Sequence, residues 1–500
     1  MQMKQIALAV AAAAASLSAQ TSVHASLTPA QADAAIGAGR VVYNAGASAP
    51  TNITYEAFIR MCQDGTAAVF THANLGAHAT PGDAVLGNNL AYACKLRTDL
   101  TGLPTGWGGN DMVFVTSVEG GSINSVVGMS TNAAQQVNFL NNFGATTTCV
   151  NSGFTTTDGR ALPIWRSCGR GKLRAHGGFS DVERQLWNNN FTADPAASDY
   201  VAPPAGVTLS QVSATAVNAY QPFALAVSNA LYEALQTAQG IPGSTRYYDL
   251  NRDGDFADLG ETVLCLLGNA SPACQPNITK RQYASITNNN PASPTKTDWA
   301  WLVGTPGIGQ KVNLCRRADT SGTQKSSEMY FLGNPVLRWA DRAGARPAAN
   351  SVDSTASFNV FEGSGTGNAK ECLSGVDLNN NGTVDGGTTP ASWSIGVLSA
   401  ENTWGPGETW KYVKLDGVAV NEDSLHVQSS CRGAYDFAMQ LILHRNTAGG
   451  VTPAAVNTFY TKLVGDMASL SLPAITGIWR GADTACFGGK GGNNAQVFTR

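Results

Sequence analysis

The sequence predicts a large α/β protein, and two observations carry this prediction. Short apolar runs alternate along the chain with amphipathic stretches, which is typical of strand–helix units. Hydrophobic residues make up 43% of the 500 residues, enough to fill a core, whereas charged residues make up only 13%. The 32 basic and 35 acidic residues give a net charge of −3, which argues against a nucleic-acid partner and against a disordered chain.

Strands are predicted where β-branched or aromatic residues form short apolar runs between turn residues. Val41-Val42-Tyr43 and Met112-Val113-Phe114-Val115 are examples of such runs. The predicted strands are 41–43, 111–116, 221–228, 311–316, 393–398 and 412–420. The segment 349–389 is rich in Gly, Asn, Ser and Thr and has the character of an insertion.

Helices are predicted to follow several of these strands. The sharpest case is the turn at 319–323, which opens a helix with Met329, Tyr330 and Leu332 on its inner face. The other predicted helices are 54–62, 182–187, 230–239 and 434–445. Each begins near Gly, Ser or Thr residues that suit a helix start.

The N-terminus has the features of a secretory signal. Lys4 precedes an uninterrupted run of small apolar residues at 6–15, and Val23-His24-Ala25 supplies small residues at a cleavage position. We therefore expect residues 1–25 to be removed and the mature chain to lie in the periplasm or outside the cell. No later stretch approaches the apolar length of a spanning helix, so the mature protein is expected not to span a membrane.

The ten cysteines are interpreted in an oxidising compartment, where an even number favours disulfides. None lies in a CxxC motif and no histidine has finger-like spacing, so a zinc site is not expected. Proximity in sequence favours three pairs, Cys62/Cys94, Cys149/Cys168 and Cys265/Cys274, while the other pairings stay open.

Four turns next to predicted helices contain Gly with Ser or Thr. They are 46–48, 121–122, 178–181 and 321–323. Glycine lets the backbone approach a ligand, and a helix start presents N–H groups with a partial positive charge. Hydroxyls add donors without adding charge, so these turns together suit an oxyanion. Arg317 adds a guanidinium fork for such a ligand.

The segment Arg317-Ala318-Asp319-Thr320-Ser321-Gly322-Thr323 resembles the RxDxSGT signature of the periplasmic phosphate-binding proteins of the high-affinity phosphate transporter. The loop 46–50, Ser122, Ser180-Asp181 and the segment 414–418 resemble other parts of that family in the same order. The resemblance implies a two-lobed type II periplasmic-binding-protein fold with hinge strands near 221–228 and 393–398. Lobe one is then expected at 26–222 and 398–500, and lobe two at 223–397.

The resemblance also implies how a phosphate would be held. Asp181 would accept the proton of a protonated oxyanion, which sulfate lacks, and Arg317 would make the charged contact while Asp319 holds it. Hydroxyl and backbone donors would come from lobe one and from the helix start in lobe two: Ser48, Ala49, Ser122, Ser321, Gly322 and Thr323. The implied partners are phosphate or a related oxyanion and an ABC-type permease.

Two acidic loops in the expected second lobe resemble EF-hand-type calcium loops. Both place oxygen side chains at alternating positions with Gly at position six. The predicted structural calcium ligands are Asp249, Asn251, Asp253, Asp255 and Glu261 in the first loop, and Asp377, Asn379, Asn381 and Asp385 in the second. The alternative is an Asx-rich turn without a metal.

No enzymatic activity and no catalytic cofactor are predicted. GxSxG and HExxH motifs are missing and the six histidines do not cluster in sequence; His176, close to Asp181, is interpreted as a loop or supporting residue. Two alternatives stay open. One is a secreted structural or adhesive protein that uses calcium for stability, and the other is an extracellular phosphate-ester hydrolase.

Overall fold

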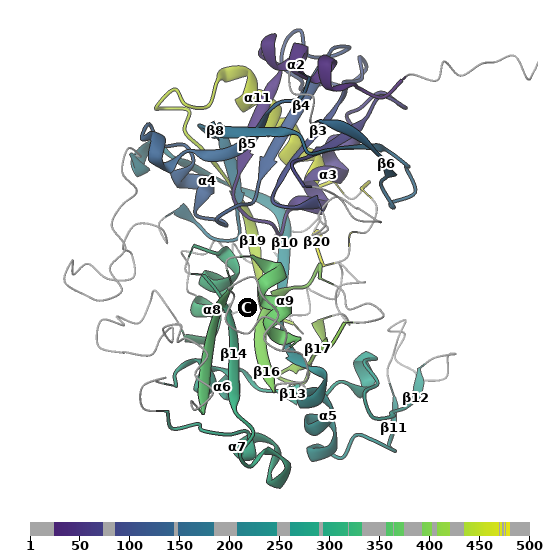
Figure 1. Ribbon diagram of the computed structural model, residues 1–500, viewed down its shortest axis with the longest axis vertical. Helices are drawn as coiled ribbons and strands as arrows, with labels where there is room; N and C mark the ends of the chain where they lie inside the picture. Colours follow the sequence, from purple (N-terminus) through teal and green to yellow (C-terminus); the bar gives the residue numbers. More distant parts are fainter. Residues whose placement is uncertain are drawn as a thin grey trace, which may run out of the picture.

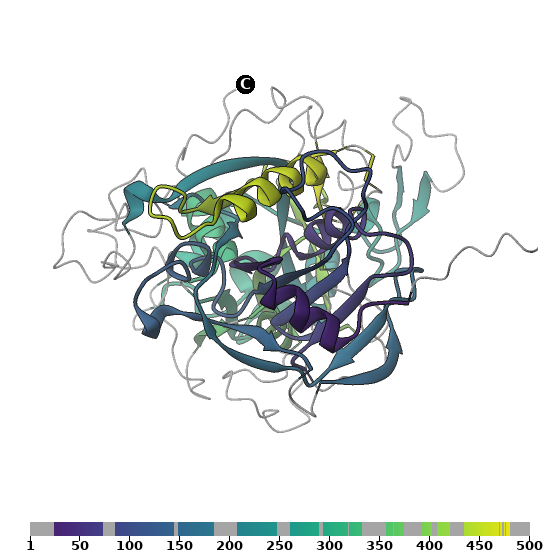
Figure 2. The same cartoon turned by 90° about the horizontal axis from the view of Figure 1, so that it is seen from above.

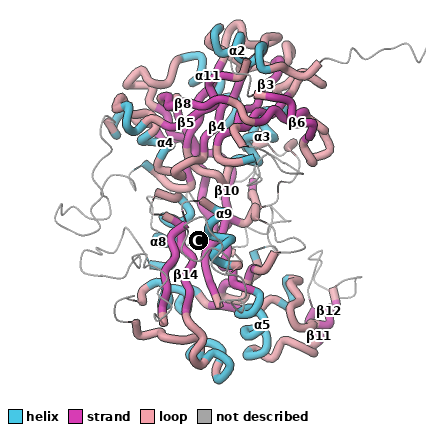
Figure 3. The backbone as a smooth tube through the Cα atoms, viewed as in Figure 1, coloured by secondary structure: helices cyan, strands magenta, loops and turns pink. Residues whose placement is uncertain are grey.

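The computed structural model has two lobes joined by extended strands (Figure 1). The described residues are 25–73, 86–144, 149–184, 208–247, 261–289, 294–318, 320–332, 357–363, 365–374, 393–402, 408–420, 435–469, 471–472, 475 and 477–480. Strands lie at the centre of each lobe and helices flank them (Figure 3), so the predicted α/β class is confirmed. Within the described residues, no helix is both long and apolar enough to cross a bilayer.

The sheet of lobe one is mixed. Its strands are β1 (Val41–Ala45), β2 (Ala68–Thr71), β3 (Asn89–Lys95), β4 (Asp111–Ser117), β6 (Val150–Thr155), β7 (Pro163–Arg166), β9 (Gly177–Ser180) and β19 (Ala438–Arg445). They follow the order β6-β7-β2-β3-β4-β1-β9-β19. β1 is parallel to β4 and to β9, so the carboxyl ends of these three strands meet at one edge. A separate ribbon pairs β5 (Val137–Asn142) with β8 (Gly169–Leu173).

β10 (Ser213–Ser228) joins the two lobes. Its first part pairs with β19 in lobe one, and its residues from Phe223 to Val227 pair with β16 (Ser394–Ser399) in lobe two. The other strands of lobe two are β14 (Val312–Arg317), β15 (Phe358–Gly363) and β17 (Trp410–Tyr412). β14 is parallel to both β15 and β16, so these carboxyl ends also meet at one edge.

The strand pairings favour a second crossing later in the chain than 393–398. β17 pairs with the lobe-two part of β10, and β18 (Lys414–Leu415) pairs with β13 (Asn277–Ile278). The short β20 (Trp479–Arg480) pairs with β10 at Ala219 and Tyr220, close to the point where β10 passes from lobe one to lobe two. Since β19 belongs to lobe one, the pairings favour a crossing between Val420 and Ala438, and we propose that lobe two extends to about 420.

Helices cover the sheets of both lobes. Lobe one has α2 (Pro29–Gly37), α3 (Thr51–Ile59), α4 (Asn124–Val127) and α11 (Ala454–Met467). Lobe two has α5 (Asn229–Ala238), α6 (Lys280–Thr287), α7 (Ala300–Val303), α8 (Gly322–Leu332) and α9 (Thr366–Leu373), with a small ribbon of β11 (Thr245–Tyr247) and β12 (Thr262–Leu264). In lobe one α11 packs against α3, as the view from above shows (Figure 2).

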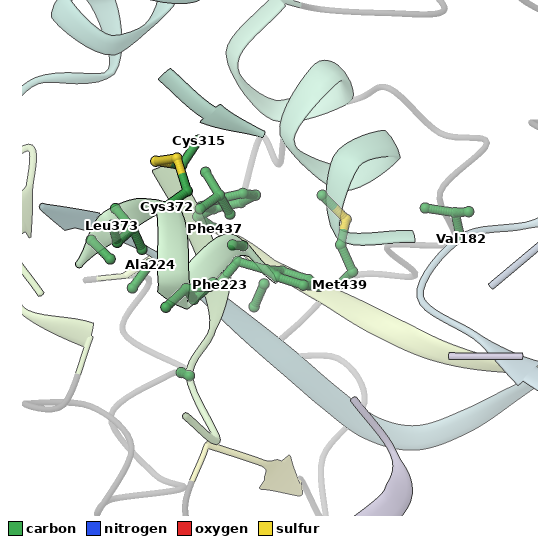
Figure 4. Packing of buried hydrophobic residues seen from close by; sticks show 14 of the residues in the cluster. Val182, Phe223, Ala224, Cys315, Cys372, Leu373, Phe437 and Met439 are labelled. Carbon is green, nitrogen blue, oxygen red and sulfur yellow. A yellow bond between two sulfur atoms is a disulfide. The ribbon is translucent and has the colours of Figure 1, made fainter. Parts of the chain in front are cut away.

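Four disulfides join cysteines within the described residues. The three pairs favoured by sequence, Cys62–Cys94, Cys149–Cys168 and Cys265–Cys274, are confirmed. A fourth, Cys315–Cys372, ties β14 to α9 beside Leu373, Ala224 and Phe223 (Figure 4). It therefore fixes the helix that follows β15 against the strand that ends in Arg317. Cys431 and Cys486 lie outside the described residues.

Three sequence predictions are wrong. Residues 438–445 form β19 rather than a helix, because the segment pairs with β9 and β10 and this burial overrides its helix-favouring Ala, Met and Leu residues. The turn at 178–181 is mostly the buried strand β9, and residues 185–187 of the predicted helix 182–187 lie outside the described residues. The insertion-like segment 349–389 contains β15 and α9.

Candidate functional site at the junction of the lobes

The site lies where the carboxyl ends of parallel strands from both lobes meet, the usual position of ligand sites in α/β sheets. In lobe one, the loops after β1, β4 and β9 carry Ser48, Ser122 and Asp181. In lobe two, β14 ends in Arg317 and leads into α8, which begins at Gly322. The predicted residues thus come from both lobes, as a clamp requires.

Direct contacts join the lobes at this point. The Gly322 N–H donates to the Ser122 Oγ over 3.0 Å, and that hydroxyl donates to Asp181 Oδ2 over 3.1 Å. A backbone bond of 3.2 Å from the Ile123 N–H to the Thr320 carbonyl lies beside them. The start of α8 therefore reaches the Ser122 turn and Asp181, so the described structure is closed at this junction.

Gly322 is required for this close approach. A Cβ atom at position 322 would overlap the Asp181 carboxylate and the Ser122 hydroxyl. Gly121 is similarly restricted, because it has a φ of +80° and its Cβ would meet the Thr320 carbonyl at 2.9 Å. Glycine at both positions lets the two backbones come together.

Asp181 is a buried carboxyl with spare hydrogen-bonding capacity. Only 2% of the residue is exposed. Its Oδ2 accepts from Ser122, whereas its buried Oδ1 has no hydrogen-bond partner among the described residues. Burial raises the pKa of Asp181 to about 6, although the Ser122 hydrogen bond and the charge of Arg317 act in the opposite direction. An unsatisfied buried oxygen is costly, and a ligand that carries a proton would satisfy it.

Arg317 is the buried cation that faces this carboxyl. It is 6% exposed, and its Nη1 donates to the Thr366 Oγ1 at the start of α9 over 2.9 Å. Burial lowers the pKa of Arg317 to about 10, and the charges of Asp181 and Glu401 oppose that shift, so the guanidinium stays charged near neutral pH. The Cys315–Cys372 disulfide holds α9, and with it Thr366, beside Arg317.

The serine turn of lobe one is held from behind. Ser125 Oγ donates to the Ser122 carbonyl over 2.7 Å and also contacts His444 Nδ1 at 2.8 Å. Burial, with a smaller effect of Arg184, lowers the pKa of His444 to about 3, so this ring is neutral. A neutral histidine on β19 thus orients the turn without adding charge to the site.

Four other predicted residues lie in the loop after β1 and at the start of α8. Ser48 is half-buried and Ala49 is buried after β1, and the Ser48 carbonyl accepts the Thr51 hydroxyl over 2.6 Å. Ser321 and Thr323 are buried at the start of α8. Asp319 lies outside the described residues.

His176 is held against the strand β1. Its Nδ1 accepts the Tyr43 N–H over 3.2 Å, and burial lowers the pKa of the ring to about 4. The expectation of a supporting role, packed against Tyr43 with ring centroids 5.3 Å apart, agrees with this geometry.

The predicted calcium ligands lie outside the described residues except for Glu261, which is fully buried. Those outside are Asp249, Asn251, Asp253, Asp255, Asp377, Asn379, Asn381 and Asp385. Among the residues that the structure describes, no group of three or more His, Cys, Asp or Glu side chains is placed to hold a metal ion. Structural calcium stays a proposal.

Sequence reasoning missed two polar residues at the lobe-two edge. Thr366 follows β15 and accepts a hydrogen bond from Arg317. Glu401 follows β16, where its charge opposes the lowering of the Arg317 pKa by burial, and the charge of Asp181 adds to the rise of the Glu401 pKa that burial causes. A signal for both exists in the sequence, because polar residues directly after parallel strands gather at one edge. The strand that precedes Thr366, β15, was not predicted, because the composition of the segment 349–389 indicated an insertion.

No protein-family model matches the chain, and no curated protein matches it in sequence. Solved structures that are similar to it include a putative phosphate ABC transporter substrate-binding protein with bound phosphate from Clostridium perfringens, at 14% identity and a TM-score of 0.27, covering 52% of this chain and 68% of that one.

Two further similar structures have related descriptions. An ABC-type phosphate transport receptor from Vibrio cholerae has 12% identity and a TM-score of 0.25, covering 52% of this chain and 68% of that one. A phosphate-binding protein from Stenotrophomonas maltophilia has 13% identity and a TM-score of 0.34, covering 85% and 83%. Because these values are low, the function proposed below rests on the chain's own residues.

Proposed function

We propose that this chain is an exported solute-binding protein that captures phosphate, or a related protonated oxyanion, between its two lobes. The observation that carries the proposal is the buried Asp181 carboxyl, whose Oδ1 has no hydrogen-bond partner in the described part of the chain and which faces the charge of Arg317. An arginine attracts an oxyanion, and a carboxylate next to it favours one that can donate a proton. Binding, rather than catalysis, is the proposed role.

The other donors support the same ligand. The start of α8 brings backbone N–H groups and a partial positive charge to the junction, where Ser321 and Thr323 are buried. The Gly322 N–H and the Ser122 hydroxyl, which bond to each other in the described structure, would turn to the anion when it binds. Lobe closure would surround the anion with contacts from both sides. We further propose delivery to an ABC-type permease and a location in the periplasm or outside the cell.

Titration calorimetry of the mature chain with phosphate, arsenate and sulfate near pH 7.5 tests this proposal. Phosphate and arsenate, which carry a proton at this pH, are expected to give heat and to raise Tm. Sulfate, which carries none, is expected to bind far more weakly because it places unprotonated oxygens against Asp181. The absence of heat and of any Tm shift with all three anions would reject the proposal.

Replacement of Gly322 with alanine is expected to weaken phosphate binding by about 5- to 100-fold, since overpacking typically costs about 1–3 kcal/mol. The added Cβ would overlap Asp181 and Ser122 and hold the lobes apart. Gly367→Ala on α9 is a matched control, because a Cβ there meets nothing within 4 Å. Calorimetry on both variants checks the prediction, and equal affinities in the two would contradict it.

A further inference from the structure

Glu401 is a second carboxyl at the same edge, placed by the strand next to β14. Parallel pairing aligns Cys315 on β14 with Gly396 on β16, so both strands end at the junction. Arg317 is the last residue of β14, and Glu401 lies two residues beyond Ser399, the last residue of β16. The topology therefore presents Glu401 to the region that Arg317 and Asp181 occupy.

The Glu401 carboxyl is held in one position. Its Oε1 accepts the Ser399 hydroxyl over 2.6 Å, and the chain around it is fixed by bonds of 2.9 Å from Asn402 Nδ2 and 3.0 Å from the Tyr412 hydroxyl to the Ser399 carbonyl. A Cβ at Gly477 would overlap the Glu401 backbone, so that loop packs closely against it. The residue is partly exposed, yet its Oε2 is buried without a hydrogen-bond partner in the described residues.

The charged and titratable groups around Glu401 come from four elements. Burial raises the pKa of Glu401 to about 7; the Ser399 hydrogen bond and its own backbone lower that pKa, Asp181 beyond β9 raises it and Lys370 on α9 lowers it. Burial lowers the pKa of Arg317 on β14 and raises that of Tyr412 on β17; the charge of Glu401 opposes the first shift and adds to the second, to which Tyr435 also contributes. Near neutral pH, one guanidinium thus faces two carboxyls, and a bound anion would add further negative charge.

We propose that Glu401 is the proton-coupled carboxyl at the junction of the lobes: it takes up a proton from solvent on Oε2 when the oxyanion binds, while Asp181 accepts the proton that the ligand carries. This inference rests on the function proposed above. Protonation of Glu401 removes one negative charge from a buried site that otherwise repels the anion. Proton uptake by Glu401 also couples the affinity for the anion to pH.

The sign of the pH effect follows from linkage. Uptake of a proton on binding means that phosphate affinity falls as pH rises through the value at which free Glu401 titrates. With free Glu401 titrating near 7, about 0.8 proton per anion is expected at pH 7.5, beyond what phosphate itself exchanges. Glu401→Gln, a neutral mimic of the protonated side chain, is expected to bind phosphate about tenfold more tightly than the native chain at pH 8 and about equally at pH 6.

Calorimetry with inorganic phosphate in buffers of different ionisation enthalpy measures the proton count directly. The titration of phosphate itself is common to all variants and cancels in the difference between them. Glu401→Gln is expected to lose the additional proton, whereas Glu371→Gln, an exposed carboxyl on α9, is expected to keep it. Ser399→Ala removes a bond that favours ionised Glu401 and is expected to move the maximum of proton uptake to higher pH.

The outcomes separate the two proposals. Phosphate binding with the same proton count in the native chain and in Glu401→Gln overturns the role of Glu401 and leaves the proposed function standing. No binding of any oxyanion by the native chain overturns both. If Glu401→Gln does not fold, an unchanged proton-uptake maximum in Ser399→Ala overturns the inference instead.

Discussion

Replacement of Arg317 with alanine is expected to lower the affinity for phosphate by about 100- to 4,000-fold, because removal of one partner of a buried charge pair costs about 3–5 kcal/mol. Arg317 is buried, donates to Thr366 and is the cation whose charge acts on Asp181. Without it, the carboxyls of Asp181 and Glu401 would repel an incoming anion. Calorimetry with phosphate measures the loss.

The design of this experiment separates binding from folding. Arg97→Ala is a suitable control, since Arg97 pairs only with Asp99 on the surface among the described charges, and surface pairs contribute little. Arg317→Lys keeps a charge but loses the planar fork, so it is expected to fall between the native chain and the alanine variant. A native-like melting curve for Arg317→Ala together with unchanged phosphate affinity would contradict the proposed site.

The convergence of the turns could be predicted because it depends on local patterns. Short apolar runs such as β1 and β14 end in Gly, Ser or charged residues, and parallel strands bring their carboxyl ends to one edge. Asp181, Ser122 and Gly322 are accordingly brought into hydrogen-bonded contact. The resemblance of the Arg317 segment to a known signature predicted that Arg317 and Asp181 lie in different lobes.

Other parts could not be predicted because long-range pairing decides them. β19 has residues that favour a helix, yet it lies between β9 and β10, and its burial there outweighs its intrinsic propensity. Thr366 and Glu401 carry no motif, and only the pairing of β14 with β15 and β16 shows that they share an edge with Arg317. The effect of burial on the pKa of Glu401 follows from the fold alone.

Replacement of Asp181 with asparagine is expected to change the selectivity of the site. Asparagine keeps the shape of the side chain, removes its negative charge and adds an N–H donor. Phosphate affinity is expected to fall, because the carboxylate that accepts the ligand's proton is lost, while sulfate affinity rises about tenfold or more, as the removal of about 1.4 kcal/mol of repulsion would give. Competition between the two anions in calorimetry measures the change.

The native chain is expected to show the same switch as a function of pH. Burial raises the pKa of Asp181 to about 6, so acidification from pH 7 to pH 5 protonates it and turns it from an acceptor into a donor. Sulfate stays unprotonated over this range, and its affinity is therefore expected to rise as pH falls, by up to about tenfold per pH unit above the Asp181 pKa.

Comparison of variants separates the contributions of Asp181 and Glu401 to the pH dependence of sulfate affinity. Asp181→Asn is expected to lose the rise in sulfate affinity between pH 7 and pH 5, but to keep the part near pH 7 that Glu401 supplies, since burial raises the pKa of Glu401 to about 7. The double variant Asp181→Asn/Glu401→Gln is expected to bind sulfate with little dependence on pH. Equal pH slopes in the native chain and in Asp181→Asn would mean that Asp181 does not contact the anion.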